Sequence, residues 1–298
     1  MVIGSRGSKL ALWQARWIQA RLEGMGISSR MEIIQTSGDK ITDVALAKVG
    51  TKGLFTKEIE EALLDGRIDL AVHSLKDLPA DLPPGLTIAA VPEREDARDV
   101  IVGAPIPEWK PGARIGTSSI RRAAQLRALR PDVSPENIRG NVDTRLRKLD
   151  EGQFAAILLA AAGLRRLGWA DRIAQVLEAG EMCPAVGQGA LAVESRDDGG
   201  PAFEVCRKLD HRSTRAAVTA ERALLAALGG GCQLPAGAHA RVEGEALRID
   251  AVVVSPDGLQ VVRGASDGHR DQASSIGAKL GERLLREGGR RILEQVLG

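Results

Sequence analysis

Hydroxyl and guanidinium groups gather in one short segment, Gly-Thr-Ser-Ser-Ile-Arg-Arg at 116–122, between an expected strand and an expected helix. The first N–H groups of a helix and nearby hydroxyls can hold an anion, and guanidiniums match carboxylate or phosphate. A Ser/Thr helix cap with surface arginines is the alternative for this segment alone. It is not a P-loop, because no Gly-Lys-Ser/Thr follows. The candidate anion ligands are Thr117, Ser118, Ser119, Arg121 and Arg122.

Arginines follow two further expected strands in the same part of the chain. Arg139 and Arg145 open and close the segment Arg-Gly-Asn-Val-Asp-Thr-Arg, and Arg165 stands next to Arg166 after a later strand. Because the carboxyl ends of parallel strands meet at one edge of a sheet, we expect these groups to converge on one anion site. Scattered surface arginines are the alternative. Which residue of the adjacent pair faces the ligand is left open at this point.

The first part of the chain carries similar strand-end groups. Arg6 follows the first expected strand, and Ser8 stands near the start of the next helix. The segment His-Ser-Leu-Lys-Asp-Leu-Pro at 73–79 also follows a strand and supplies the point charge of Lys76 and the carboxylate of Asp77. In a cationic site, such a carboxylate can stabilise a cation formed during a reaction, or relay a proton. A local salt bridge between the two is the alternative.

Cys232 stands in a glycine-rich segment, Gly-Gly-Gly-Cys-Gln-Leu-Pro, whose backbone freedom can expose a thiol. A lone cysteine is more often structural, and we interpret Cys183 and Cys206 in that way. The sequence has no CxxC pair and its four histidines are scattered, so we expect no metal site. Gln188, in the turn Pro-Ala-Val-Gly-Gln-Gly-Ala, is a weaker candidate for a hydrogen bond to a ligand.

Composition narrows the class of ligand. The net charge of the 298 residues is only +2, but residues 112–172 hold twelve basic and six acidic side chains. This local excess favours a local anionic ligand over general nucleic-acid binding, and an aromatic content of 2% argues against stacking on single strands. Arginine codon bias in a GC-rich genome is the alternative reason for the many arginines. The longest apolar run, 154–164, is too short to span a membrane, so we expect a cytoplasmic protein.

Hydrophobic periodicity predicts strands alternating with helices, and therefore parallel sheets with crossover helices, over the first two thirds of the chain. The expected strands are 2–5, 31–35, 69–73, 86–91, 113–116, about 136–139 and 155–159, and the expected helices are 10–22, 57–64, 119–129, 143–150 and 161–168. The charge run 93–99 is interpreted as a domain crossing. The last third predicts a helix at 212–228, antiparallel strands at 238–242, 247–254 and 259–265, and one final helix over about 271–296.

Eight segments, in this order, resemble the porphobilinogen deaminase family nearly end to end. No single segment is decisive, but the ordered set is specific. The segments are Ile-Gly-Ser-Arg at 3–6, Leu-Ala-Lys-Val-Gly at 46–50, Lys-Gly-Leu-Phe at 52–55, and those at 73–79, 116–122, 139–142, 184–189 and 230–233.

The resemblance implies a transferase of tetrapyrrole biosynthesis. Such an enzyme joins four porphobilinogen molecules head to tail on a dipyrromethane primer, with loss of ammonia, and water then releases hydroxymethylbilane. The resemblance places the primer on Cys232 through a thioether and makes Asp77 the catalytic carboxylate. The expected cofactor contacts are Lys76, Ser74, Asp77, Thr117, Ser119, Arg121, Arg122, Arg139 and Gln188. The expected substrate contacts are Arg6, Ser8, Ser118, Arg139, Arg145 and Arg166, and Lys48 and Lys52 belong to the family's flexible loop.

The fold implied is α/β. It has two lobes like those of periplasmic binding proteins, with mostly parallel sheets, and a small C-terminal α+β domain with an antiparallel sheet. We expect domain 1 at 1–94 and 187–208, domain 2 at 95–186 and domain 3 at 209–298. The expected partner is porphobilinogen, without metal, nucleic acid or membrane, and the family suggests a monomer. Two rivals are a non-catalytic anion-binding protein with the same lobes, which would need neither Asp77 nor Cys232, and a nucleic-acid binder.

Overall fold

The computed structural model describes residues 1–40, 56–230 and 234–297. The chain divides into two compact units, each discontinuous in sequence. Unit 1 is Met1–Glu95 with Ala190–Arg215, and unit 2 is Asp96–Gly189 with Ala216–Gly298. The first boundary falls inside the charge run 93–99. The finer division into three domains, with boundaries at 94/95, 186/187 and 208/209, stays a prediction.

Unit 1 is built on a five-stranded sheet with the strand order β2-β1-β3-β10-β4. Its strands are β1 (Val2–Ser5), β2 (Arg30–Ile33), β3 (Leu70–Ser74), β4 (Leu86–Ala90) and β10 (Leu191–Arg196). Its helices are α1 (Lys9–Gly24), α2 (Ser37–Lys40), α3 (Lys57–Leu64), α7 (Pro201–Arg207) and a 3₁₀ turn at Leu75–Asp77, while α8 (Arg212–Ala227) begins in this unit.

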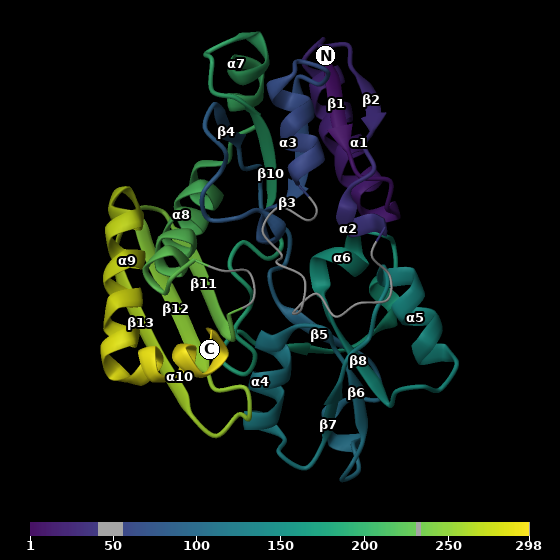
Figure 1. Cartoon of the computed structure of the whole chain (residues 1–298), viewed down its shortest axis with the longest axis vertical. Helices are drawn as coiled ribbons and strands as arrows, with labels where there is room; N and C mark the ends of the chain where they lie inside the picture. Colours follow the sequence, from purple (N-terminus) through teal and green to yellow (C-terminus); the bar gives the residue numbers. More distant parts are fainter. Residues whose placement is uncertain (41–55, 231–233, 298) are drawn as a thin grey trace. The chain divides into compact units, whose positions relative to one another are not determined.

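Alternating side chains of the strands bury both faces of this sheet. On β3, Leu70 and Val72 join a core cluster with α1 and α7, whereas Ala71 faces a second cluster that contains Ile59 of α3. Successive residues of a strand point to opposite faces, so helices cover both sides and the sheet is the middle of three layers (Figure 1). This burial fixes the register of β3, whose last residues lead directly into the 3₁₀ turn with Asp77.

Unit 2 contains a second five-stranded sheet, with the order β7-β6-β8-β5-β9. Its strands are β5 (Asp99–Gly103), β6 (Arg114–Gly116), β7 (Ser134–Glu136), β8 (Ala156–Ala160) and β9 (Ile173–Leu177). Its helices are α4 (Ile120–Leu129), α5 (Val142–Asp150) and α6 (Ala161–Arg166), with short 3₁₀ turns at Ile106–Glu108 and Ala170–Arg172. Residues of β5 alternate between two clusters: Val100 and Val102 face α5 and α6, and Ile101 faces the cluster with Leu126 of α4.

The C-terminal part of unit 2 is a three-stranded antiparallel sheet of β11 (Ala236–Glu243), β12 (Ala246–Val254) and β13 (Val261–His269). Helices α8 and α9 (Ala273–Leu284) bury one face of this sheet, and α10 (Arg290–Leu297) packs near β12 (Figure 1). Val252 and Val254 on the opposite face join a small cluster with Ala124 of α4 and Cys183. Contacts of α4 therefore connect the two sheets within this unit.

Both five-stranded sheets are mixed, where we expected mostly parallel ones. In each sheet two pairings are parallel and two are antiparallel. The antiparallel pairings involve β5 and β10, which follow the first two of the three points where the chain passes from one unit to the other. These strands enter their sheets without a strand–helix–strand crossover, which is the connection that makes neighbours parallel. The α/β class and the antiparallel third sheet are confirmed.

The structure corrects three further expectations. β5, β9 and α7 were not predicted, because the charge and Pro-rich runs hid β5 and the others are short. The strand expected at 136–139 lies earlier, at Ser134–Glu136. The single helix expected over 271–296 is interrupted by a five-residue π turn at Leu285–Gly289, in which Gly288 has φ 121°. Glycine adopts this left-handed conformation readily, and the helix axis changes there.

Candidate functional site

The turn between β6 and α4 holds the first predicted anion ligands. Ser119 caps α4 by accepting a hydrogen bond from the N–H of Arg122 at 3.3 Å, and Thr117 Oγ1 accepts one from the Ser119 N–H at 3.2 Å. Ser118 Oγ donates to the carbonyl of Ile138, at the end of the neighbouring chain segment. The hydroxyls of this turn therefore fix the start of α4 and the direction of its two arginines.

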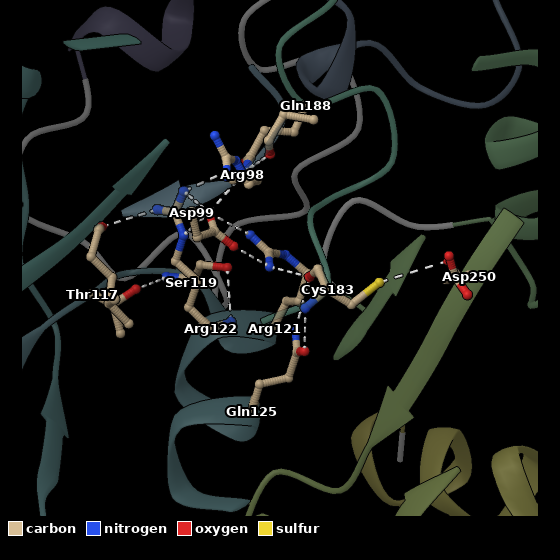
Figure 2. A network of polar contacts seen from close by, with 12 residues as sticks. Arg98, Asp99, Thr117, Ser119, Arg121, Arg122, Gln125, Cys183, Gln188 and Asp250 are labelled. Atoms are coloured by element: carbon tan, nitrogen blue, oxygen red, sulfur yellow. Dashed lines mark hydrogen bonds and ion pairs between the residues drawn. The ribbon is translucent and has the colours of Figure 1, made fainter. Parts of the chain in front are cut away.

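Asp99, the first residue of β5, is the centre of a buried polar network (Figure 2). Its Oδ2 accepts a hydrogen bond from Arg121 Nη1 at 2.6 Å, and its Oδ1 accepts from Arg122 Nε at 2.9 Å. Gln188 Nε2 donates to the same Oδ1 at 2.8 Å and also to the carbonyl of Ala97 at 2.7 Å. The two arginines, predicted as ligands of an anion, are therefore held by a carboxylate of the protein itself.

Burial and charge pairing shift the pKa values in this network in opposite directions. Burial alone would raise the pKa of Asp99, but Arg121, Arg122 and the Gln188 amide hold it well below its usual value. Burial lowers the pKa of Arg122, and Asp99 opposes that change. Asp99 is therefore ionised and both guanidiniums are cationic at neutral pH, so the three side chains carry a net charge of one positive unit.

Arg121 also links the network to the third sheet. Its Nη1 donates to the carbonyl of Cys183 at 2.5 Å, and Gln125 bonds the N–H and the carbonyl of the same residue at 2.8 and 3.0 Å (Figure 2). The next carbonyl, that of Pro184, accepts a hydrogen bond from the N–H of Ala238 in β11 at 3.0 Å. The segment Cys183–Pro184 thus contacts both the start of β11 and the first arginine of α4, Arg121.

Arg139 and Arg145 form a cationic group with Arg122. Burial lowers the pKa of Arg145 to about 10, and the charges of Arg122 and Arg139 add to this effect. Arg145 Nε donates to the carbonyl of Gly140 at 2.8 Å. The expected convergence of strand-end arginines therefore holds for these three, and a group of guanidiniums that repel one another is suited to an anionic ligand.

The adjacent pair at the end of α6 separates into two environments. Arg165 pairs with Asp96 at 2.9 Å and its side chain is 41% exposed. Arg166 is buried, and its Nη2 donates to the carbonyl of Gly189 at 2.7 Å. The expected preference for Arg166 as a ligand contact stays a prediction.

The remaining described candidates lie in unit 1. Ser8 Oγ caps α1 by accepting from the N–H of Ala11, and Ser74 Oγ, at the end of β3, accepts from Gln14 Nε2 at 2.9 Å. Asp77 ends the 3₁₀ turn after β3 and is exposed, and Lys76 next to it and Arg6 after β1 are half-buried. Unit 1 therefore presents Asp77 on a short turn that the register of β3 fixes.

Three predicted residues, Cys232, Lys48 and Lys52, lie outside the described residues. Cys183 and Cys206, interpreted as structural, are buried free cysteines, and burial raises the pKa of each thiol to about 12. Within residues 1–40, 56–230 and 234–297, no three His, Cys, Asp or Glu side chains are grouped as a metal site would require.

Sequence reasoning missed Asp99 and Gln125. Asp99 was the last residue of a charge run interpreted as a domain crossing, and Gln125 lies inside a helix without a motif. The one available signal was that 100–102 is a short apolar run, which makes the preceding acid the first residue of a buried strand.

Comparisons with known proteins agree with this picture. The family model of the porphobilinogen deaminase dipyromethane cofactor binding domain matches residues 1–202, and that of the porphobilinogen deaminase C-terminal domain matches residues 215–286. The chain belongs to the porphobilinogen deaminase family. It is 51% identical to a porphobilinogen deaminase of Syntrophobacter fumaroxidans over 99% of this chain and 97% of the relative. It is also 51% identical to one of Pelotomaculum thermopropionicum, over 99% of this chain and 96% of the relative.

Among solved structures, a periplasmic substrate-binding protein of an ABC transporter from Coxiella burnetii matches at a TM-score of 0.42 and 12% identity, covering 70% of this chain and 91% of that one. As a porphobilinogen deaminase, the chain is a transferase of tetrapyrrole biosynthesis that condenses porphobilinogen stepwise on a dipyrromethane cofactor. The family assignment supports the enzyme over the two rival interpretations, a non-catalytic binding protein and a nucleic-acid binder. No helix in the described part of the chain is long and apolar enough to cross a membrane.

Proposed function

We propose that unit 2 holds the carboxylates of the pyrrole chain with the group Arg122, Arg139 and Arg145. The observation that carries this proposal is the environment of Arg145, whose pKa is lowered by burial and by the charges of Arg122 and Arg139, while its Nε donates to the carbonyl of Gly140. Each pyrrole ring carries an acetate and a propionate, and guanidinium forks pair with such groups in bidentate fashion. The donor chemistry of unit 2 therefore fits a dipyrromethane and the rings added to it.

Cys232 is the proposed attachment point, through a thioether, because the family motif Gly-Gly-Cys-Gln falls on it and because Cys183 and Cys206 are buried with raised pKa values. A buried thiol that stays protonated is a poor nucleophile. When bound, the dipyrromethane supplies the pyrrole carbon to which the first substrate is joined. The other proposed contacts are Arg6, Ser8, Ser74, Lys76, Thr117, Ser118, Ser119, Arg121, Arg166 and Gln188. Lys48 and Lys52, which lie outside the described residues, stay candidates from the family resemblance.

Asp77 is the proposed catalytic carboxylate. Loss of ammonia from porphobilinogen leaves a cation, and an ionised carboxylate near the pyrrole N–H stabilises that cation and can accept a proton from the new bond. The exposed position of Asp77 on a turn of fixed register agrees with a side chain that meets a ligand. We further propose a cytoplasmic monomer with domains 1–94 plus 187–208, 95–186 and 209–298, which acts without a metal.

The intact denatured mass of the purified protein tests the attachment. We expect the wild type to exceed its sequence mass by two porphobilinogen units less two ammonias. Cys232→Ser should show the bare mass, and Cys206→Ser, a matched change at a buried thiol, should keep the increment. A bare wild-type mass that stays bare after incubation with porphobilinogen would overturn the proposal.

A further inference from the structure

Asp99 uses donors of Arg121 and Arg122 that a ligand carboxylate would otherwise take. Arg121 reaches both Asp99 oxygens, at 2.6 and 3.2 Å, and Arg122 Nη2 lies 2.7 Å from Oδ1. The side chains of the two arginines are only 5% and 7% exposed, and that of Asp99 is fully buried. An internal carboxylate thus already pairs with both guanidiniums.

Asp99 also sets the charge of the neighbouring cationic group. In the described part of the chain, the carboxylate paired with both guanidiniums is that of Asp99, and it cancels one of their two positive charges. The charge of Arg122 reaches Arg145, as the lowered pKa of the latter indicates. Loss of the Asp99 charge would therefore leave the charge of Arg122 uncompensated beside Arg145.

We propose that Asp99 is a positioning residue that limits how tightly the arginines of unit 2 bind ligand carboxylates. The inference rests on the proposed function of Arg122, Arg139 and Arg145. Stepwise elongation requires each acetate and propionate to be bound and then to move on when the next ring is added. A cationic group with no internal counter-charge would bind these groups too tightly to release them, because Coulomb attraction is strong where water is excluded.

The alternative is that Asp99 has only a structural role and stabilises the contact between β5 and α4. The two accounts differ in what loss of the charge does. If the role is only structural, loss of the Asp99 charge should lower the stability of the protein and leave KM and kcat per folded molecule unchanged. A residue that limits binding predicts tighter binding of anions and slower turnover.

Asp99→Asn tests this, because the amide keeps the size of the side chain and removes its charge. We expect KM for porphobilinogen to fall by about tenfold or more, because one unit charge about 10 Å from a ligand carboxylate changes its binding by about that factor at an effective dielectric constant near 20. We expect kcat to fall as well, and intact-mass spectra to show enzyme-bound chains of intermediate length accumulating. Asp210→Asn, in unit 1, is the control, since Asp210 also pairs with an arginine, Arg215, at 2.7 Å; there KM should not move.

A second readout needs no turnover. Added inorganic phosphate should raise the melting temperature of Asp99→Asn more than that of the wild type or of Asp210→Asn, because phosphate replaces the lost counter-charge. The phosphate response tests the inference about Asp99 alone. The proposed function is tested separately, and it fails if the wild type carries no covalent mass increment. An equal response of all three proteins to phosphate would overturn the inference.

The double variant Asp99→Asn with Gln188→Glu covers the case in which the single variant does not fold. Gln188 Oε1 already accepts from Arg122 Nη2 at 3.4 Å, so a glutamate there returns a carboxylate to the same guanidinium. We expect KM and the phosphate response to return toward the wild-type values. Stability should recover only in part, because the carbonyl of Ala97 loses the donor it has in Gln188. A KM that stays low in the double variant, or rises in the single one, contradicts the role assigned to Asp99.

Discussion

A Cβ atom on Gly237 would lie 2.6 Å from the carbonyl oxygen of Cys183 and 2.8 Å from that of Pro184. The absence of a side chain therefore lets β11 approach the segment that Arg121 and Gln125 hold. The hydrogen bond from the Ala238 N–H to Pro184 depends on that approach. Because β11 begins four residues after Cys232, this contact fixes the described end of the segment that follows the proposed attachment point.

We predict that Gly237→Ala lowers the free energy of unfolding by about 1–3 kcal/mol, the usual cost of overpacking against atoms that cannot move away. Urea denaturation measures this change. Gly180→Ala is the control, since no atom lies within 4 Å of the Cβ position there. Equal stability of the two variants would show that β11 shifts without cost.

The sequence predicts the elements of this fold better than it predicts the contacts between them. β1 was predicted at Val2–Ser5 and α3 at Lys57–Leu64, as found, because their apolar patterns are local. Asp99 was missed as a functional residue because its partners, Arg121 and Gln188, lie 22 and 89 residues away. Residues so far apart in the sequence leave no periodic pattern that could be recognised. The structure was therefore needed to identify Asp99 as the internal counter-charge of the arginines.

Part of the candidate site was predictable from the order of the strands. Arg139 and Arg145 follow a strand, and their convergence with Arg122 comes from strand order alone. The burial of Arg121 was not predictable. An arginine just after a helix cap is expected to be exposed to solvent unless its carboxylate partner is known.

Glu60 provides a pH-dependent prediction. Burial raises its pKa, and Glu194 on β10 adds to the rise, while the Thr56 hydroxyl and His73 oppose it. A carboxyl group with a raised folded-state pKa stabilises the protein below its unfolded value of 4.5 and loses that contribution as pH rises through the folded value. Glu60→Gln should therefore increase the free energy of unfolding at pH 7 by up to about 1 kcal/mol, with the gain shrinking toward pH 4.5.

Urea denaturation across this pH range measures the gain. Glu282→Gln, at an exposed position on another helix with a surface ion pair to Arg286 at 4.0 Å, is the control and should show no such pH-dependent gain. A gain for Glu60→Gln that does not change with pH would mean that ionisation of Glu60 is not its source.

Arg145→Leu should interrupt elongation. The substitution removes a guanidinium from the group with Arg122 and Arg139, so the longer pyrrole chains lose a carboxylate partner while the early ones are less affected. We expect turnover to fall by about 10–100-fold, as for loss of a charge-assisted contact of about 1.5–3 kcal/mol. Intact mass after a short pulse of porphobilinogen should show bound chains of intermediate length.

The same variant, Arg145→Leu, should lose turnover without losing stability. The pKa of Arg145 is lowered in the folded protein to about 10, so its charge costs stability at neutral pH. Arg145→Leu should therefore not lower the melting temperature in phosphate-free buffer, and it should respond less to added phosphate. Arg147→Leu, an exposed position on the same helix with an i,i+4 pair to Glu151, is the matched control. Full-length product at the wild-type rate from Arg145→Leu would remove it from the binding group.

Asp77→Asn should fold normally and lose turnover. Asp77 is exposed, so its amide replacement costs little stability, but the amide can neither stabilise a developing cation by charge nor accept a proton. We expect kcat to fall by about 10²–10⁴-fold, the range for loss of a positioned acid–base group. Because the primer is itself built from porphobilinogen, the cofactor increment should be measured by mass in the same preparation, and turnover given per loaded molecule. Asp81→Asn, an exposed carboxylate four residues further on, should keep wild-type turnover. If Asp77→Asn keeps it as well, the carboxylate that stabilises the cation is another residue.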